Sequence, residues 1–153
     1  MTSQERLDVL QVVANIEQTT LGMSKTLKVV AKDMRESMWG YYQEYEWTIY
    51  VNRSYLEDKS APEMLDTICH EAYHAYQWSL AEAYCKVDKE TRNLQLFREI
   101  EPYVEEFLSY KDGLEDPGEY YNQKVEADAR TYAAKRVIGY LLLLEDLEEG
   151  GEE

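Results

Sequence analysis

The stretch SAPEMLDTICHEAYHAYQWSLAEAY, residues 60–84, determines how the rest of the chain is interpreted. Its opening residues, from Ser60 to Glu63, combine a serine N-cap, a proline in the first turn and a glutamate at the third helical position. Together these features are typical of a helix start. Small and apolar residues then recur at three- and four-residue spacing: Leu65, Ile68, Ala72, Ala75 and Ser79. The sequence therefore predicts one amphipathic helix from Ser60 to about Tyr84, with small residues on its buried face.

Residues 70–74 of this helix read HEAYH. Side chains four residues apart lie above one another on a helix, so His70 and His74 present two imidazole nitrogens to one point, as a single metal ion requires. Glu71 is close enough to act on a metal-bound water without itself binding the metal. With only two histidines in the chain, this arrangement has a chance of roughly one in a thousand. We therefore expect a zinc site in which Glu71 is the catalytic residue.

The third metal ligand must come from another part of the chain. Catalytic zinc has three protein ligands, and since both histidines are already used, the third is a carboxylate or a cysteine. Glu126 is the best candidate because VEADARTYAAKR, residues 125–136, places Ala129 and Ala133 on the same helix face, where small residues allow close helix packing. For Asp128, a surface position is favoured over an orienting hydrogen bond to a metal-binding histidine.

The rest of the pattern indicates a mixture of helices and strands. In chain order, the predicted elements are an N-terminal helix over 4–20, a strand over 26–31, a turn over 43–46, a strand over 47–51, one kinked or two short helices over 91–111, a turn region over 111–118 and a final helix over about 119–147. Pro102 is expected to bend or restart the middle helix, and Gly139 could interrupt the last one.

Length and composition predict a single domain. The 153 residues are 44% hydrophobic, which is enough for a core, and the net charge of −15 makes nucleic acid an unfavourable partner. We divide the chain into an N-terminal helix (1–21), a catalytic core (26–136) and an acidic, disordered tail (145–153). Because the sequence has neither a signal-peptide pattern nor a membrane-spanning stretch, we expect a cytoplasmic protein without a membrane partner. Cys69 and Cys85 are expected to be reduced thiols.

These motifs resemble those of the gluzincin metallopeptidases, in which HExxH is followed downstream by a glutamate ligand on a second helix. The segments WTIYVN, HEAYHAYQ and YYNQKVEADARTYA are similar to those of the minigluzincins and the ImmA/IrrE-type peptidases over residues 26–136. The resemblance implies an α+β fold, in which a small three-stranded sheet packs on the active-site helix among N-terminal, inserted and C-terminal helices. It also implies a zinc endopeptidase acting on peptide or protein substrates, with Glu126 as the third ligand and residues 47–51 as the substrate-binding edge strand.

The chain departs from the short gluzincin pattern in the 52 positions that separate His74 from Glu126. We expect an inserted helical hairpin over 85–118 to fill this stretch. Tyr120, Tyr121 and Tyr132 are the candidates for stabilising an oxyanion. The alternative function is a latent or inactive zinc-binding protein that acts as a regulatory or binding module, with the N-terminal helix or the acidic tail lying over the cleft.

Overall fold

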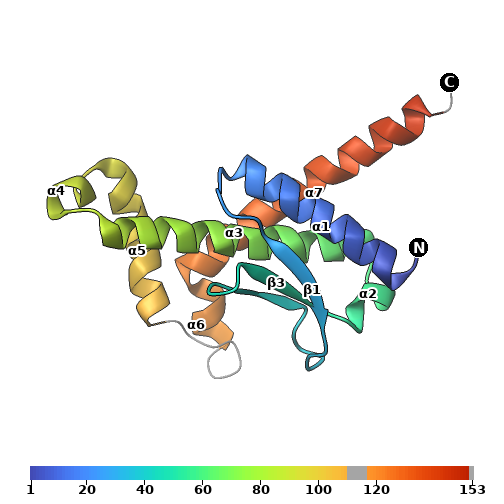
Figure 1. Cartoon of the computed structure of the whole chain (residues 1–153), viewed down its shortest axis with the longest axis horizontal. Coiled ribbons are helices and arrows are strands. Elements are labelled where there is room, and N and C mark those ends of the chain that lie inside the picture. The colour runs from blue at the N-terminus through green and yellow to red at the C-terminus, as the bar shows by residue number, and fades with distance from the viewer. Residues whose placement is uncertain (110–116, 152–153) are drawn as a thin grey trace.

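Helix α3 (Ala61–Lys86) runs through the middle of the molecule, and the other elements are arranged around it (Figure 1). This computed structural model describes residues 1–109 and 117–151. The predicted start of α3 is confirmed by a capping box: Ser60 Oγ accepts a hydrogen bond from the Glu63 backbone N–H, and the Glu63 carboxylate accepts one from Ser60 N–H at 2.8 Å. The helix carrying HEAYH is thus fixed at its N-terminus by its own sequence.

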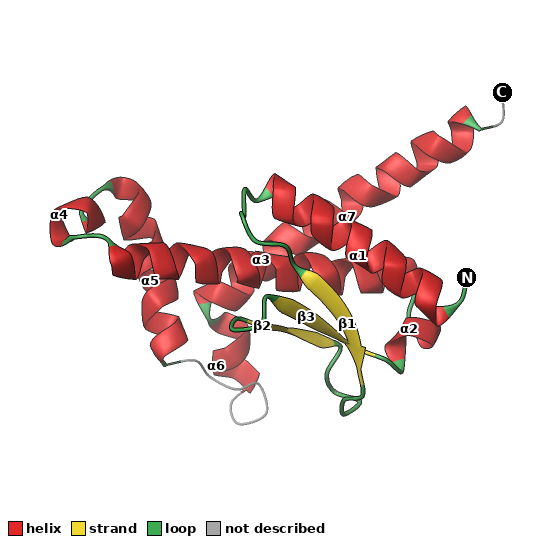
Figure 2. Cartoon of the chain, in the orientation of Figure 1, coloured by secondary structure: helices red, strands yellow, loops and turns green. Residues whose placement is uncertain are grey.

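The sheet contains β1 (Lys28–Lys32), β2 (Gly40–Gln43) and β3 (Thr48–Asn52), in the order β1-β3-β2 (Figure 2). Strand β3 is parallel to β1 and antiparallel to β2. The predicted α+β fold with a small three-stranded sheet is therefore confirmed. The expectation that residues 47–51 form an edge strand was wrong, because β3 lies in the centre of the sheet and is paired on both sides. The edge strand that packs on α3 is β2.

Helix α1 (Ser3–Thr20) is joined to the C-terminal helix α7 (Lys124–Gly150) through a fully buried glutamate. The Glu17 carboxylate accepts hydrogen bonds from the Tyr132 hydroxyl, from Arg136 Nε at 2.7 Å and from the Tyr140 hydroxyl at 2.7 Å. Because a buried charge is tolerated only when it is paired and hydrogen-bonded, this cluster fixes α1 against α7. The short helix α2 (Tyr55–Asp58) is held on α1 by Arg6, which donates to the Leu56 carbonyl.

The predicted inserted segment contains α4 (Lys89–Arg92) and α5 (Gln95–Leu108). Pro102 lies inside a continuous α5, so the middle helix is neither divided nor restarted there. A second, smaller core joins α5 to the later part of α3 and the start of α7 through the buried residues Ile100, Tyr103 and Val125. Of the predicted turn region, residues 110–116 lie outside the described part of the chain.

The predicted final helix is divided near Gln123 into α6 (Pro117–Asn122) and α7. Gly139 does not interrupt α7, which extends beyond the rest of the molecule (Figure 1). Residues 145–150 are helical, which differs from the expected disordered tail; the remaining residues 152–153 are not described. Within the described ranges, the structure contains no helix that is both long enough and apolar enough to span a membrane.

The contact between α1 and α7 predicts a large effect of the conservative change Glu17→Gln. The amide cannot neutralise Arg136, so we expect the free energy of unfolding to fall by about 2–3 kcal/mol. Urea denaturation with an unchanged m-value measures this loss. The exposed control Glu99→Gln should stay within about 0.5 kcal/mol of the natural protein. Equal stability of both variants would show that the cluster does not hold α1 in place.

Candidate metal centre

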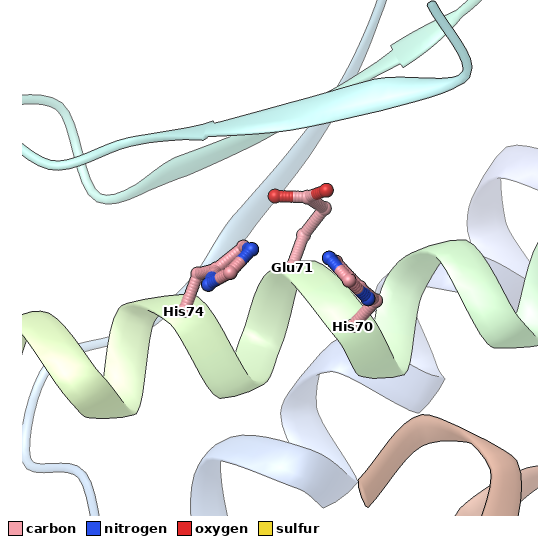
Figure 3. Close-up of side chains that lie close together, drawn as sticks. All are labelled: His70, Glu71 and His74. Atoms are coloured by element: carbon pink, nitrogen blue, oxygen red, sulfur yellow. The ribbon is translucent and has the colours of Figure 1, made fainter. Parts of the chain in front are cut away.

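His70, Glu71 and His74 project from the same stretch of α3 (Figure 3). The two imidazole rings are perpendicular, at an interplanar angle of 87°, with their centroids 4.6 Å apart. Each of the three residues offers a ligand atom, and these atoms all lie within 4.8 Å of one another. The structure thus brings together the three residues that the HEAYH motif predicted to be neighbours.

Glu126 comes from the first turn of α7 and reaches both histidines. One of its carboxylate oxygens lies 3.0 Å from His70 Nε2, and the other lies 3.1 Å from His74 Nε2. The Glu126 side chain is only 1% exposed, against 16% and 12% for the histidines. Two imidazole nitrogens and a buried carboxylate therefore meet at one point beside α3.

This donor set matches the chemistry of a divalent metal site. Two histidines and one glutamate are a known ligand set for catalytic zinc, which binds nitrogen and oxygen at about 2.0–2.2 Å. Two ligands of a tetrahedral ion with such bonds lie roughly 3.3–3.5 Å apart. The measured separations of 3.0 and 3.1 Å are a few tenths of an ångström shorter. Small side-chain movements would thus allow these three residues to hold an ion.

Close packing of α3 and α7 makes this arrangement possible. Ala129 and Ala133 on α7, which share a helix face with Glu126, are fully buried. Close packing was predicted from these two alanines. Small side chains let two helix backbones approach, which brings Glu126 within reach of the histidines on α3.

Glu71 points from α3 towards the sheet (Figure 3). Burial raises the pKa of its carboxyl group, and the charge of Glu126 raises it further. The two histidines and the Tyr42 backbone lower this pKa, but the net shift is upward. Strand β2 comes this close because Gly40 has no side chain. A Cβ at position 40 would lie 2.7 Å from the Tyr50 carbonyl oxygen and 3.1 Å from the Thr67 side chain.

The fully buried residue Gln77 fixes the orientation of His74. Its amide nitrogen donates to the Val125 carbonyl at 3.0 Å, so its amide oxygen is left to accept a hydrogen bond from His74 Nδ1 at 2.8 Å. When the proton of a neutral His74 is held on Nδ1, its Nε2 atom has a lone pair that can bind a metal ion. Gln77 was not predicted as a site residue, although the sequence places a glutamine on the same helix face three residues after His74.

Asp128 does not contact a histidine through its described hydrogen bonds. It accepts from the Tyr103 hydroxyl at 2.5 Å and from Lys124 Nζ at 2.6 Å. Its side chain is 32% exposed, in keeping with the favoured surface position. The residue that orients a histidine is thus Gln77, and Asp128 instead links α7 to α5.

Helix α5 also caps the N-terminus of α7. The two carboxylate oxygens of Glu106 accept hydrogen bonds from the backbone N–H groups of Lys124 and Val125, each at 2.7 Å. These donors have no partner within the helix, so a carboxylate there stabilises the first turn. Glu126 is the next residue along the chain. The inserted segment therefore positions the turn of α7 that carries the candidate ligand.

His74 holds a proton when no metal is bound. Burial lowers the pKa of His74, but the hydrogen bond to Glu126 and the charges of Glu71 and Glu126 outweigh that effect and raise it to about 9. His74 is therefore protonated at neutral pH. A metal ion must displace this proton, so metal binding becomes more favourable as the pH rises towards 9.

The remaining candidate residues are a cysteine and three tyrosines. Cys69 is fully buried, and burial raises the pKa of its thiol, so it stays neutral. The Tyr132 hydroxyl is bound to Glu17, and its ring stacks on Tyr73 at 4.6 Å. Tyr120 belongs to α6, whereas the side chain of Tyr121 lies outside the described part of the structure.

The contact between Gln77 and His74 predicts that Gln77→Leu weakens metal binding. Leucine has a similar size but cannot accept the Nδ1 proton, so we expect zinc affinity to fall by about 10- to 100-fold. Competition with a chromophoric chelator measures this affinity. Gln95→Leu, on the exposed surface of α5, is the matched control and should bind zinc normally. Normal affinity of Gln77→Leu would show that Gln77 does not orient the ligand.

The comparisons with known proteins identify a family. The SprT-like family matches residues 9–90, which is more than half of the 153 residues. The matched stretch contains the sheet and HEAYH but ends before α5 and α7, so Glu126 lies outside it. No curated protein and no solved structure matches the chain. Together with the HEAYH geometry, the match supports a metallopeptidase-like domain. The chain therefore belongs to the SprT-like family.

Proposed function

We propose that this protein is a zinc-dependent endopeptidase that binds its metal through His70, His74 and Glu126. The observation that carries the proposal is the contact of one buried carboxylate with Nε2 of both histidines. Membership of the SprT-like family supports the same function. Zinc is favoured over other divalent ions because imidazole with a single carboxylate suits zinc, whereas magnesium and calcium prefer sites made of oxygen ligands.

When bound, zinc would polarise the scissile carbonyl group and lower the pKa of water to about 7. Glu71 is placed to move the protons of the reaction. Its carboxylate accepts a proton from the attacking water and later donates it to the nitrogen of the leaving amine. Burial supports both roles, because it raises the pKa of the Glu71 carboxyl group and so makes the carboxylate a better proton acceptor.

A substrate peptide can lie along β2. This edge strand packs on α3, and the Tyr42 backbone is close enough to the Glu71 carboxylate to lower its pKa. An extended peptide that adds to the edge of β2 would therefore bring its own backbone to the catalytic residue. Binding along a strand edge does not depend on either end of the peptide, and this favours internal cleavage.

The ligand set of two histidines and a downstream glutamate is of the gluzincin type, and the small sheet on the active-site helix supports a minigluzincin-like arrangement. A narrower ImmA/IrrE-type assignment stays a prediction. The alternative function is zinc binding without catalysis. It differs from the proposed function in one measurable respect. The zinc-loaded protein would then cleave no peptide, whether or not Glu71 is replaced.

Two variants separate metal binding from catalysis. Glu71→Gln should keep one zinc ion per chain but lose at least about 10³-fold in peptide cleavage, because the amide cannot accept a proton from water. Glu126→Ala should lose zinc as well as activity, because two histidines alone are an incomplete site. Metal content is measured by atomic emission, and cleavage with a peptide library. The exposed control Glu99→Gln should match the natural protein in both assays.

Three results would contradict the proposal. Unchanged zinc content in Glu126→Ala would exclude Glu126 as a ligand. Equal cleavage by the natural protein and Glu71→Gln would exclude Glu71 as the catalytic residue. Zinc binding by both without any cleavage would favour the non-catalytic alternative.

A further inference from the structure

A pocket of about 250 Å³ opens next to His74. It is lined by His74 itself, by Trp78 one helical turn later on α3, by Phe107 of α5, by Val125 of α7 and by Glu44. Since one water molecule occupies about 30 Å³ of liquid, the volume corresponds to roughly eight waters, which is the size of one long side chain. The pocket is thus large enough to hold a single side chain beside the candidate metal centre.

The walls of the pocket are apolar and aromatic. Trp78 and Phe107 stack face to face, with ring centroids 4.2 Å apart and an interplanar angle of 15°. Val125 is fully buried. Phe107 packs against the second core, whereas Trp78 packs against the larger hydrophobic core. A flat aromatic wall of this kind favours an aliphatic chain or a planar cation lying against it.

The pocket has a carboxylate in its lining. Glu44 is the acidic residue among the described residues that line it. Burial raises the pKa of the buried Tyr42 hydroxyl, and the charges of Glu82 and Glu44 raise it further. The Tyr42 hydroxyl has no hydrogen-bond partner among the described residues. Apart from His74, the candidate metal ligand, the described lining contains no basic residue, so the Glu44 carboxylate favours a positively charged occupant.

The position of Glu44 places the pocket on the path of the substrate. Residues of β2 follow α3 in the same direction: Gly40 lies against Thr67, Tyr42 meets Glu71, and Glu44 shares the pocket with His74. Glu44 is the first residue after β2, and a hydrogen bond of 3.2 Å from Glu46 N–H to the Gln43 carbonyl closes the turn. A peptide paired with β2 would therefore reach this pocket with a residue close to the scissile bond.

We propose that this pocket selects a long basic side chain, arginine above all, in the residue that flanks the scissile bond. The stem packs on Trp78, Phe107 and Val125, and the guanidinium group pairs with Glu44. This inference rests on the proposed peptidase function and specifies its substrate class. Two of the walls, Phe107 and Val125, lie outside the stretch that matches the SprT-like family, so the family match alone does not give this preference.

The test compares arginine with citrulline, which has the same shape but no charge. Quenched fluorescent peptides carry either residue at each of the two positions on both sides of the scissile bond, and further peptides carry phenylalanine or leucine there. The zinc-loaded full-length protein, Glu44→Gln and the exposed control Glu36→Gln are compared by kcat/KM. Binding of the same peptides to zinc-loaded Glu71→Gln, with and without Glu44→Gln, is measured in parallel by fluorescence anisotropy.

We expect arginine to exceed citrulline by at least about fivefold in kcat/KM at one position, and Glu44→Gln to reduce that ratio to below about twofold. Glu36→Gln should keep the full ratio. Cleavage with equal rates for arginine and citrulline, or with a preference for phenylalanine or leucine, would overturn the inference while leaving the peptidase function intact.

The binding measurement keeps the two proposals separate. If no peptide is cut but Glu71→Gln binds the arginine peptide more tightly, in a manner that depends on Glu44, the pocket assignment stands and the peptidase function fails. If no peptide is cut and both peptides bind equally, the pocket assignment fails as well.

Discussion

The structure depends on one contact, in which the buried carboxylate of Glu126 lies between Nε2 of His70 and Nε2 of His74. A carboxylate from α7 can reach α3 only if the two helix backbones are close. The fully buried alanines of α7 at positions 129 and 133, on the same helix face as Glu126, meet that requirement, because larger side chains there would push the helices apart. Burial of the Glu126 charge is in turn tolerated only because both imidazoles face it. The close packing of α3 and α7 and the pairing of the Glu126 charge with the imidazoles therefore depend on each other.

The segment that contains α4 and α5 supports the candidate metal centre and also forms part of the pocket beside it. Glu106 of α5 caps the turn of α7 that carries Glu126, and Tyr103 of the same helix donates to Asp128 one turn later. Gln77 links the two halves, since one end of its amide holds His74 and the other holds the Val125 carbonyl. The same segment supplies a wall of the pocket beside the site. Helix α5 thus positions a candidate ligand and shapes the space in which a substrate residue would bind.

Local patterns predicted α3 and its two histidines well, because a capping box and a four-residue spacing are both properties of a single helix. The Glu126 contact was predicted from the alanines that follow it. The order of the strands was not, because WTIYV is apolar on both faces whether it lies at the centre or at the edge, and pairing decides between them. Gln77 was missed because its role depends on Val125, which is 48 positions away. The end of α7 was taken for a disordered tail from its charge, although leucine and glutamate both favour helix.

The central claim is that two histidines and one carboxylate hold the metal, and X-ray absorption at the zinc edge tests it most directly. The zinc-loaded protein should show two imidazoles and oxygen ligands in a single shell at about 2.0–2.1 Å, without sulfur. In Glu126→Ala, any zinc that remains bound should have lost one of these oxygen ligands. A sulfur shell at about 2.3 Å would assign a cysteine as the third ligand, and an identical spectrum for Glu126→Ala would contradict the role of Glu126.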